Sequence, residues 1–461
     1  MKRSGLFGRE GRRARGCTRR LLAGLPVVLA TASCGLWSPA ASPPYSPSLA
    51  PVGPLTIGVW LPAGLGQFRF AEADQRRLLQ LGVNWLEWLQ PEVVGSSTAE
   101  EVAMGFCGRH GLQMPVYYEP RGWTIDDKLH DWIQGEPGAA FKAAVEERVR
   151  ALQRQWQEAP GFGGYLVGHE DYRYPPYTTL QQTVEVLRQL DPVRPAYIVG
   201  GLDHYPELAR FLDAFLAGPG PPNVFQHEQY VVRGDLPVEG PRWVRAFDGL
   251  RQGYDRVARR LQGRSARWHA VVQAHQEVRD GQIAYRRPAP AELSLQVGLA
   301  LSRGASGVIY FLYSSGPEQI RQAGRLVQER WYDGLVDAQG EPGPLFAAAA
   351  ALNARLREVS PVLAGLHFRG GYPAVRLPAN PVLADAEPGL EIGLFGSGTQ
   401  TTHALVVDLV TSGERTVWLR SAGPPLWDAV SGAPLPLAGG RAKLRLEPGG
   451  FRLLAMATQG E

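Results

Sequence analysis

The sequence predicts an α/β protein: a (β/α)8 TIM barrel followed by a small C-terminal antiparallel β-sandwich. Three observations lead to this fold class. The chain has 461 residues, which is more than one ordinary domain needs. Between residues 55 and 366, apolar strand-like runs alternate with helical patterns, as in repeated βα units of a parallel sheet. From 367 to 461 the pattern changes to short alternating strands separated by turn residues.

The order of the elements supports a barrel. The predicted strands are 56–62, 83–91, 114–120, 165–167, 195–201, 223–232, 267–275 and 306–315. The predicted helices are 71–81, 97–110, 138–157, 177–190, 205–216, 243–262 and 291–303, with a closing helix that begins at 346. An open doubly wound sheet is the alternative, but the segment 62–66 after the first strand lacks the glycine spacing of a dinucleotide-binding loop.

The N-terminus has the pattern of an export signal over residues 1–34. A basic start is followed by an apolar run too short to span a bilayer, and then by small residues before Cys34. Those small residues resemble a bacterial lipobox, although Thr31 stands where leucine is usual, and the segment 18–22 resembles a twin-arginine signal. Residues 35–54 are rich in proline and serine and predict an extended tether. We therefore expect an extracytoplasmic lipoprotein held at the membrane through Cys34, with simple secretion as the alternative.

Charge and cysteine content exclude several classes of function. Residues 1–34 carry eight basic side chains and one acidic one, so the net charge of +4 becomes slightly negative without them and does not indicate nucleic acid binding. Cys107 has no partner once Cys17 is removed and Cys34 carries lipid, so we expect it to be buried and free. The histidines lack metal-ligand spacing, and no G-x-S-x-G motif is present. We expect neither a metal nor a cofactor.

Carboxylates stand at the ends of several predicted strands, and in a parallel barrel those ends form the face where chemistry is found. Glu170 follows the buried run 165–167, and Glu228 interrupts the sixth strand. Glycosidic bond cleavage needs two carboxyl groups, one to protonate the leaving oxygen and one to attack the anomeric carbon or activate water. We interpret Glu170 as the general acid/base and Glu228 as the second carboxylate. A structural ion pair with arginine is the alternative for either residue.

Other polar and aromatic residues near the strand ends suit a sugar ring. Aromatic faces match the apolar face of a pyranose, and polar side chains match its hydroxyl groups. Barrel core is the alternative role for each aromatic residue, although Trp60 and Trp123 are favoured for stacking because proline and glycine lie beside them. The expected substrate-binding residues are Trp60, Glu87, Tyr118, Glu119, Trp123, His169, Asp171, His227, Tyr230, Gln273 and Tyr313.

Several stretches together resemble glycosidase-like (β/α)8 proteins of the β-galactosidase superfamily, of clan A type. The stretches are GGYLVGHED, NVFQHEQYV, WHAVVQAHQ, RGASGVIYFLYSS, the closing helix LFAAAAALNARLREVSPVLAGL, WDAVSG and LEPGGFRLLAM. The resemblance implies that Glu170 is the acid/base. The family has Asn where this chain has His169, and a Glu nucleophile at the end of strand seven where this chain has Gln273.

Two main hypotheses follow from these features. The first is an exported glycoside hydrolase of an oligo- or polysaccharide, in which Glu228, or else Glu277, takes the nucleophile role. The second is a non-catalytic carbohydrate-binding lipoprotein on a degenerate barrel. A carbohydrate esterase or lyase is disfavoured because the nucleophile elbow is missing.

Overall fold

The computed structural model describes residues 54–61, 70–88, 97–117, 138–169, 178–201, 212, 215, 223–264, 266–322 and 325–456. The chain divides into two units, Met1–Pro43 and Pro44–Glu461, and all described residues belong to the second. The predicted export signal, the tether up to residue 53, and Cys34 lie outside the described residues. Of the helices in the described ranges, none is both long enough and apolar enough to cross a membrane.

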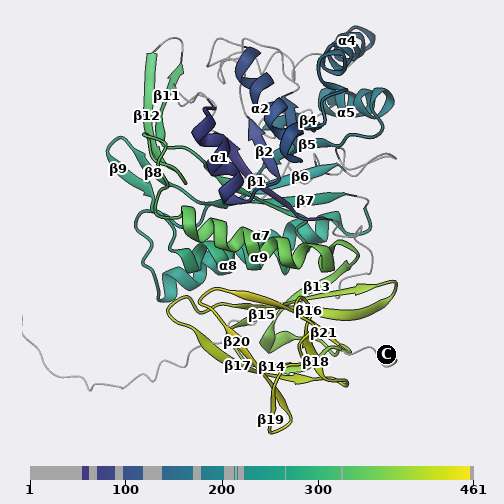
Figure 1. Ribbon diagram of the computed structural model, residues 1–461, viewed down its shortest axis with the longest axis vertical. Coiled ribbons are helices and arrows are strands. Elements are labelled where there is room, and N and C mark those ends of the chain that lie inside the picture. The colour runs from purple at the N-terminus through teal and green to yellow at the C-terminus, as the bar shows by residue number, and fades with distance from the viewer. Residues whose placement is uncertain are drawn as a thin grey trace, which may run out of the picture. The chain divides into compact units, whose positions relative to one another are not determined.

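Parallel strands form a single sheet that closes into a barrel (Figure 1). In space the order is β2-β1-β10-β7-β6-β5-β4-β3. A parallel bridge between Trp85 and Gln113 joins the two ends of this order, with the Leu86 nitrogen 2.9 Å from the Gln113 oxygen. The predicted TIM barrel is therefore confirmed. Its strands are β1 (Thr56–Leu61), β2 (Trp85–Trp88), β3 (Met114–Tyr117), β4 (Phe162–His169), β5 (Ala196–Gly200), β6 (Val224–Glu228), β7 (Arg267–Gln273) and β10 (Gly307–Phe311).

Helices pack on the outside of the barrel, and α7 shows why. Its buried residues recur every three or four positions, among them Trp243, Phe247, Leu250 and Tyr254, which gives the helix one apolar face. Pro241 stands at the first helical position, where its missing N–H removes no hydrogen bond. The helices are α1 (Glu72–Leu81), α2 (Ser97–His110), α4 (Ala139–Trp156), α5 (Thr178–Leu190), α7 (Pro241–Leu261), α8 (Pro290–Leu301) and α9 (Phe346–Ala364).

Strand residues alternate between the helices and the interior of the barrel. In β1, Val59 packs outward in the main core. Trp60 packs inward with Trp85, Leu166, Tyr197, Val199, Val224, Val271 and Ile309, which come from neighbouring and facing strands. Gly58 lies on the inward side as well, because a Cβ there would stand 2.4 Å from Ile309 Cδ1 and 2.9 Å from Trp85 Cδ1. Glycine at this position leaves room for the two larger side chains.

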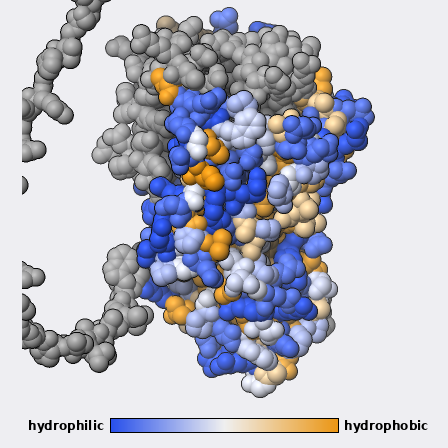
Figure 2. All heavy atoms as spheres, turned by 90° about the vertical axis from the view of Figure 1, so that its left-hand side faces the viewer, coloured by the Kyte–Doolittle hydropathy of each residue, from blue (hydrophilic) through white to orange (hydrophobic). Residues whose placement is uncertain are grey.

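Two hairpins follow barrel strands β7 and β10 and pair into one antiparallel sheet with the order β11-β12-β8-β9. The sequence patterns above do not predict this sheet, which corrects the expectation that a helix follows the seventh strand directly. Asp280 and Gly281 join β8 to β9 with φ angles of 48° and 76°, as a two-residue hairpin turn requires. Ile283 of β9 and Trp331 of β12 are exposed apolar side chains of this sheet. Figure 2 looks onto this side of the molecule, where apolar patches interrupt a mostly hydrophilic surface. The strands are β8 (Gln276–Arg279), β9 (Gln282–Tyr285), β11 (Gly316–Gln322) and β12 (Arg325–Asp333).

The C-terminal part is the expected antiparallel β-sandwich. One sheet has the order β13-β15-β16-β21-β18 and the other β14-β17-β20-β19. Ile392, Val406, Leu419 and Leu444 belong to the core between them. The strands are β13 (His367–Pro373), β14 (Leu383–Ala386), β15 (Leu390–Ser397), β16 (Gln400–Asp408), β17 (Arg415–Ser421), β18 (Leu426–Asp428), β19 (Leu437–Ala438), β20 (Arg441–Leu446) and β21 (Phe451–Met456).

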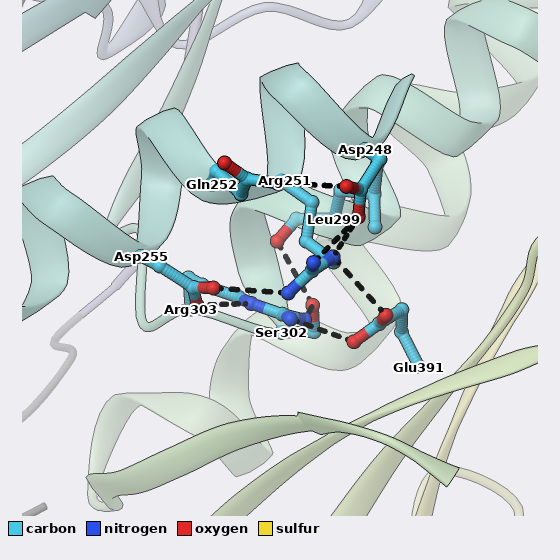
Figure 3. Close-up of polar contacts among 8 residues, drawn as sticks. All are labelled: Asp248, Arg251, Gln252, Asp255, Leu299, Ser302, Arg303 and Glu391. Carbon is cyan, nitrogen blue, oxygen red and sulfur yellow. Dashed lines mark hydrogen bonds and ion pairs between the residues drawn. The ribbon is translucent and has the colours of Figure 1, made fainter. Parts of the chain in front are cut away.

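An ionic cluster joins the barrel to the sandwich (Figure 3). The Arg303 side chain is 0% exposed, and its guanidinium donates to Asp255 of α7 at 2.9 Å and to Glu391 of β15 at 2.6 Å. Arg251 of α7 completes the cluster, at 3.1 Å from Asp255 and 3.5 Å from Glu391. Burial raises the pKa of Glu391, while the two arginines act in the opposite direction. The cluster fixes the sandwich to α7 through buried charges that all have partners.

Candidate active site

Strand β6 brings a carboxylate to the end of the barrel where the strands terminate. Val224 belongs to the interior cluster and Phe225 to the outer core, so Gln226 and Glu228 face inward by alternation. Glu228 is the last residue of β6, is half-buried, and lies in register with Val271 of β7. This position matches the prediction that Glu228 reaches the carboxyl face of the barrel.

A continuous group of aromatic rings lies beside this strand end. Phe311, at the end of β10, contacts Trp60 edge to face and stacks on Tyr230, with a centroid distance of 5.5 Å in each case. The His275 ring lies 5.2 Å from Tyr230 and 5.0 Å from Phe311. The peptide bond between Phe311 and Leu312 is cis. These rings form a wall along the ends of β1, β6, β7 and β10, and such a surface suits a flat ligand with an apolar face.

The histidine in this wall is held in one protonation state. His275 Nδ1 lies 2.9 Å from the Phe311 carbonyl oxygen, which can only accept, so Nδ1 carries the proton. Burial lowers the pKa of His275 to about 4. The imidazole is therefore neutral at neutral pH, and its Nε2 has no hydrogen-bond partner within the described ranges. His275 can accept a hydrogen bond but cannot act as a cationic acid.

Glu87, on β2, is a second carboxyl group inside the barrel. It is fully buried and accepts a hydrogen bond from the Trp85 indole N–H. Burial raises the pKa of Glu87 to about 7, although Trp85 and Gln226 oppose the rise. The Gln226 side chain lies close enough for this effect without making a hydrogen bond of ordinary geometry. A carboxyl group with this pKa can hold or release a proton near neutral pH.

Three expected sugar-binding residues are corrected by their surroundings. Gln273 uses its whole carboxamide on the backbone: it accepts from Val232 N at 3.0 Å and donates to Val232 O at 3.0 Å and to Arg286 O at 2.9 Å. His227 faces outward, with its ring against Phe225 and Tyr254 of α7, because it alternates with Glu228 along β6. Both side chains thus have structural roles.

The expected sugar-binding role of Tyr313 is also wrong, and that of Trp60 is wrong in part. Tyr313 is buried and donates to Asp74 Oδ1 of α1 at 3.1 Å, behind the barrel wall. Trp60 is 0% exposed and belongs to the barrel core, so it supports the aromatic wall from below and offers no free face for stacking.

Glu277 cannot serve as the alternative nucleophile. It lies on β8, in the hairpin sheet, and not at the end of a barrel strand. Arg279 forms a two-pronged ion pair with it, and Arg330 of β12 lies 3.7 Å away. Its carboxylate is only 3% exposed between these guanidinium groups. The role of Glu277 is to stabilise the hairpin sheet.

Several expected site residues lie outside the described residues, namely Tyr118, Glu119, Trp123, Glu170 and Asp171. For His169 only the backbone is described, as the last residue of β4. Within the described ranges, no group of three or more His, Cys, Asp or Glu side chains could hold a metal ion. The free Cys107 is buried, and burial raises the pKa of its thiol to about 12.

The structure adds residues to the site that the sequence patterns above do not assign to it: Gln226, His269, His275 and Phe311. Alternation along two strands could have found two of them. Gln226 shares the inward face of β6 with Glu228, and His269 shares that of β7 with Val271. No sequence pattern would have placed the rings of Phe311 and His275 in contact, because 36 residues separate them.

No protein-family model and no curated protein matches the sequence, but solved structures share the fold. A β-galactosidase from Bacillus circulans sp. alkalophilus superposes with a TM-score of 0.57 at 9% identity, covering 88% of this chain and 99% of that one. A GH42 β-galactosidase from G. stearothermophilus gives 0.56 at 8% identity over 87% and 98% of the two chains. An α-amylase from Anoxybacillus gives 0.51 at 9% identity over 88% and 99%. The chain therefore shares with these proteins the fold of a (β/α)8 barrel followed by a C-terminal β-sandwich.

Proposed function

We propose that the protein is a glycoside hydrolase that cleaves O-glycosidic bonds of an oligo- or polysaccharide. Glu170 is the general acid/base and Glu228 the second carboxylate. The observation that carries the proposal is the placement of Glu228, which ends barrel strand β6 beside the wall formed by Tyr230, Phe311 and His275. A carboxylate next to aromatic rings is the arrangement that a sugar ring and its scissile bond require.

In this mechanism the two carboxyl groups act on opposite sides of the bond. Glu170 protonates the leaving oxygen while Glu228 attacks the anomeric carbon or takes a proton from the attacking water. Tyr230 and Phe311 pack against the apolar face of the sugar. Because His275 Nε2 carries no proton, it accepts a hydrogen bond from a sugar hydroxyl.

A carbohydrate-binding protein without hydrolase activity is the second candidate, and Gln273 is the observation that favours it. This residue ends β7, where the resembled family carries its nucleophile, and its amide groups are all occupied by backbone partners. A barrel that has lost this carboxylate and gained no substitute would still bind sugar through its aromatic wall.

The two candidates are separated by turnover. The full-length protein in detergent is incubated with a panel of aryl glycosides, beside the Glu170→Gln variant. A hydrolase releases the aryl group, and Glu170→Gln lowers kcat by about 10³-fold while sugar affinity remains. Sugar binding by both proteins without any aryl release would establish the binding protein instead.

We further propose that the chain is exported and anchored through a lipid on Cys34. The support comes from the sequence of residues 1–34 alone. In a bacterial host, the wild-type protein is expected in the detergent phase after phase separation and Cys34→Ser in the aqueous phase. An unacylated Cys34 in the mature protein, detected by mass spectrometry, would contradict the anchor.

A further inference from the structure

The interior of the barrel contains polar side chains that the proposed carboxylate pair leaves unused. Glu87 of β2, Gln226 of β6 and His269 of β7 are each at most 2% exposed. They belong to different strands, and each carries atoms that can form hydrogen bonds. We refer to these three residues as the inner polar layer.

The inner polar layer is incompletely paired. Glu87 Oε1, both polar atoms of the Gln226 amide, and His269 Nδ1 have no hydrogen-bond partner within the part of the chain that the structure describes. Burying a polar atom without a partner is costly, and folded proteins rarely do so without a functional reason. Three such residues in one barrel therefore indicate a site for a ligand.

The three residues surround the same part of the barrel interior. Gln226 and His269 are register partners on adjacent strands, and Gln226 lies close enough to Glu87 to lower the pKa of that carboxyl. Tyr197 of β5 lies between β2 and β7 inside the barrel, with its ring centroid 4.8 Å from that of Trp85 and 6.2 Å from that of His269. Along β6, Gln226 lies two residues before Glu228 on the same face, which places it about 7 Å deeper in the barrel.

We infer that Glu87, Gln226 and His269 form the floor of the substrate pocket and bind hydroxyl groups of an uncharged sugar residue. This inference rests on the proposed function and names its substrate class. A hydroxyl group both donates and accepts, and so do a carboxyl group, a carboxamide and a neutral imidazole. The floor lies below the level at which Glu228 acts, so it binds the sugar without taking part in bond cleavage.

The inner polar layer itself contains one carboxyl group, that of Glu87, and no cationic side chain. Burial raises the pKa of Glu87 to about 7 and lowers that of His269 to about 3, so neither group offers a positive charge. Arg267 lies two residues before His269 on the same face of β7, one step deeper in the barrel, and contributes to the lowered pKa of His269. The carboxylate of a uronic acid would meet Glu87 at the floor and favour its protonated form at a cost in affinity.

The test compares two buried glutamines in the full-length protein. Gln226→Leu removes the unpaired amide of the floor. Gln296→Leu removes an amide that is equally buried but already paired with the Gln273 backbone, at 3.0 Å and 3.2 Å. With p-nitrophenyl galactoside and glucoside as probes, we expect Gln226→Leu to raise KM by roughly tenfold or more while the melting temperature stays equal or rises. Gln296→Leu should lower the melting temperature and leave KM unchanged.

Three results would overturn the inference. The first is an unchanged KM in both Gln226→Leu and the size-conserving variant Glu87→Gln, which also serves if Gln226→Leu does not fold. The second is a preference of the wild-type protein for p-nitrophenyl glucuronide over the neutral probes. The third is a wild-type protein that neither binds nor hydrolyses any of these probes, and only this result would also contradict the proposed function.

Discussion

Two buried polar regions of this protein differ in how completely they are paired. In the cluster between barrel and sandwich, Arg303 donates to Asp255, Glu391 and Ser302. In the inner polar layer, Glu87 and Gln226 keep atoms without partners among the described residues. The first region completes its hydrogen bonds within the chain, as a structural element should. The second leaves donors and acceptors for a molecule from outside, which is the property of a binding site.

The largest expected effect on stability comes from breaking the paired region. Arg303→Met removes the buried guanidinium that pairs with Asp255 and Glu391, while Arg251 stays beside both carboxylates. Removal of one partner from a buried ionic group typically costs about 3–5 kcal/mol of unfolding free energy. Urea denaturation measures this loss. KM for an aryl glycoside should not change below the unfolding transition, and a raised KM would show that the cluster also shapes the substrate site.

Replacing Glu87 inside the barrel should raise the unfolding free energy at high pH, whereas Arg303→Met lowers it. The folded-state pKa of Glu87 lies at about 7, above the ordinary value of 4.5, so its protonation stabilises the fold. This contribution is fully present below pH 4.5 and is lost as the pH rises through 7. Glutamine does not titrate, so Glu87→Gln does not lose this contribution. The unfolding free energy of Glu87→Gln minus that of the wild type should therefore be about 3 kcal/mol larger at pH 8 than at pH 4.5.

Denaturation curves at both pH values measure the effect of Glu87→Gln. The control is Glu358→Gln, which replaces an exposed carboxylate on α9. A difference between Glu87→Gln and wild type that does not change with pH would show that Glu87 is ionised throughout.

A smaller effect on stability is expected at Gln273, which ends β7 and forms hydrogen bonds with backbone groups through its amide. Glu at position 273 would present a carboxylate to the carbonyl oxygens of Val232 and Arg286, which now accept from the Gln273 amide. Gln273→Glu should lose about 2 kcal/mol of unfolding free energy and gain no turnover. A variant with unchanged stability and increased aryl glycoside hydrolysis would show instead that a carboxylate at position 273 can act as a nucleophile in this barrel.

Elements with a regular pattern could be predicted from the sequence. The helix expected at 97–110 is α2 (Ser97–His110), and the seven other barrel strands besides the short fourth are found within their expected ranges. The hairpin sheet shows the limit. Asp280-Gly281 is a strong turn signal, but the predicted seventh strand ends at 275 and the next expected element is the helix at 291–303. Strand β7 ends at Gln273, before His275.

The roles of individual site residues depended on contacts between distant segments. Gln273 is fixed by Val232, 41 residues away, and Glu277 by Arg330, which belongs to the other hairpin. Pairing of this kind leaves no local pattern in the sequence. Alternation along β6, by contrast, is a local pattern, and it turns Glu228 inward and His227 away from the site.

The most direct test of the central claim is the steady-state hydrolysis of aryl glycosides by Glu228→Gln, with sugar binding measured by calorimetry on the same protein. We expect kcat to fall by about 10³-fold, while sugar affinity and melting temperature stay close to those of Glu358→Gln. Undiminished turnover by Glu228→Gln would contradict the assignment of Glu228 as the second carboxylate.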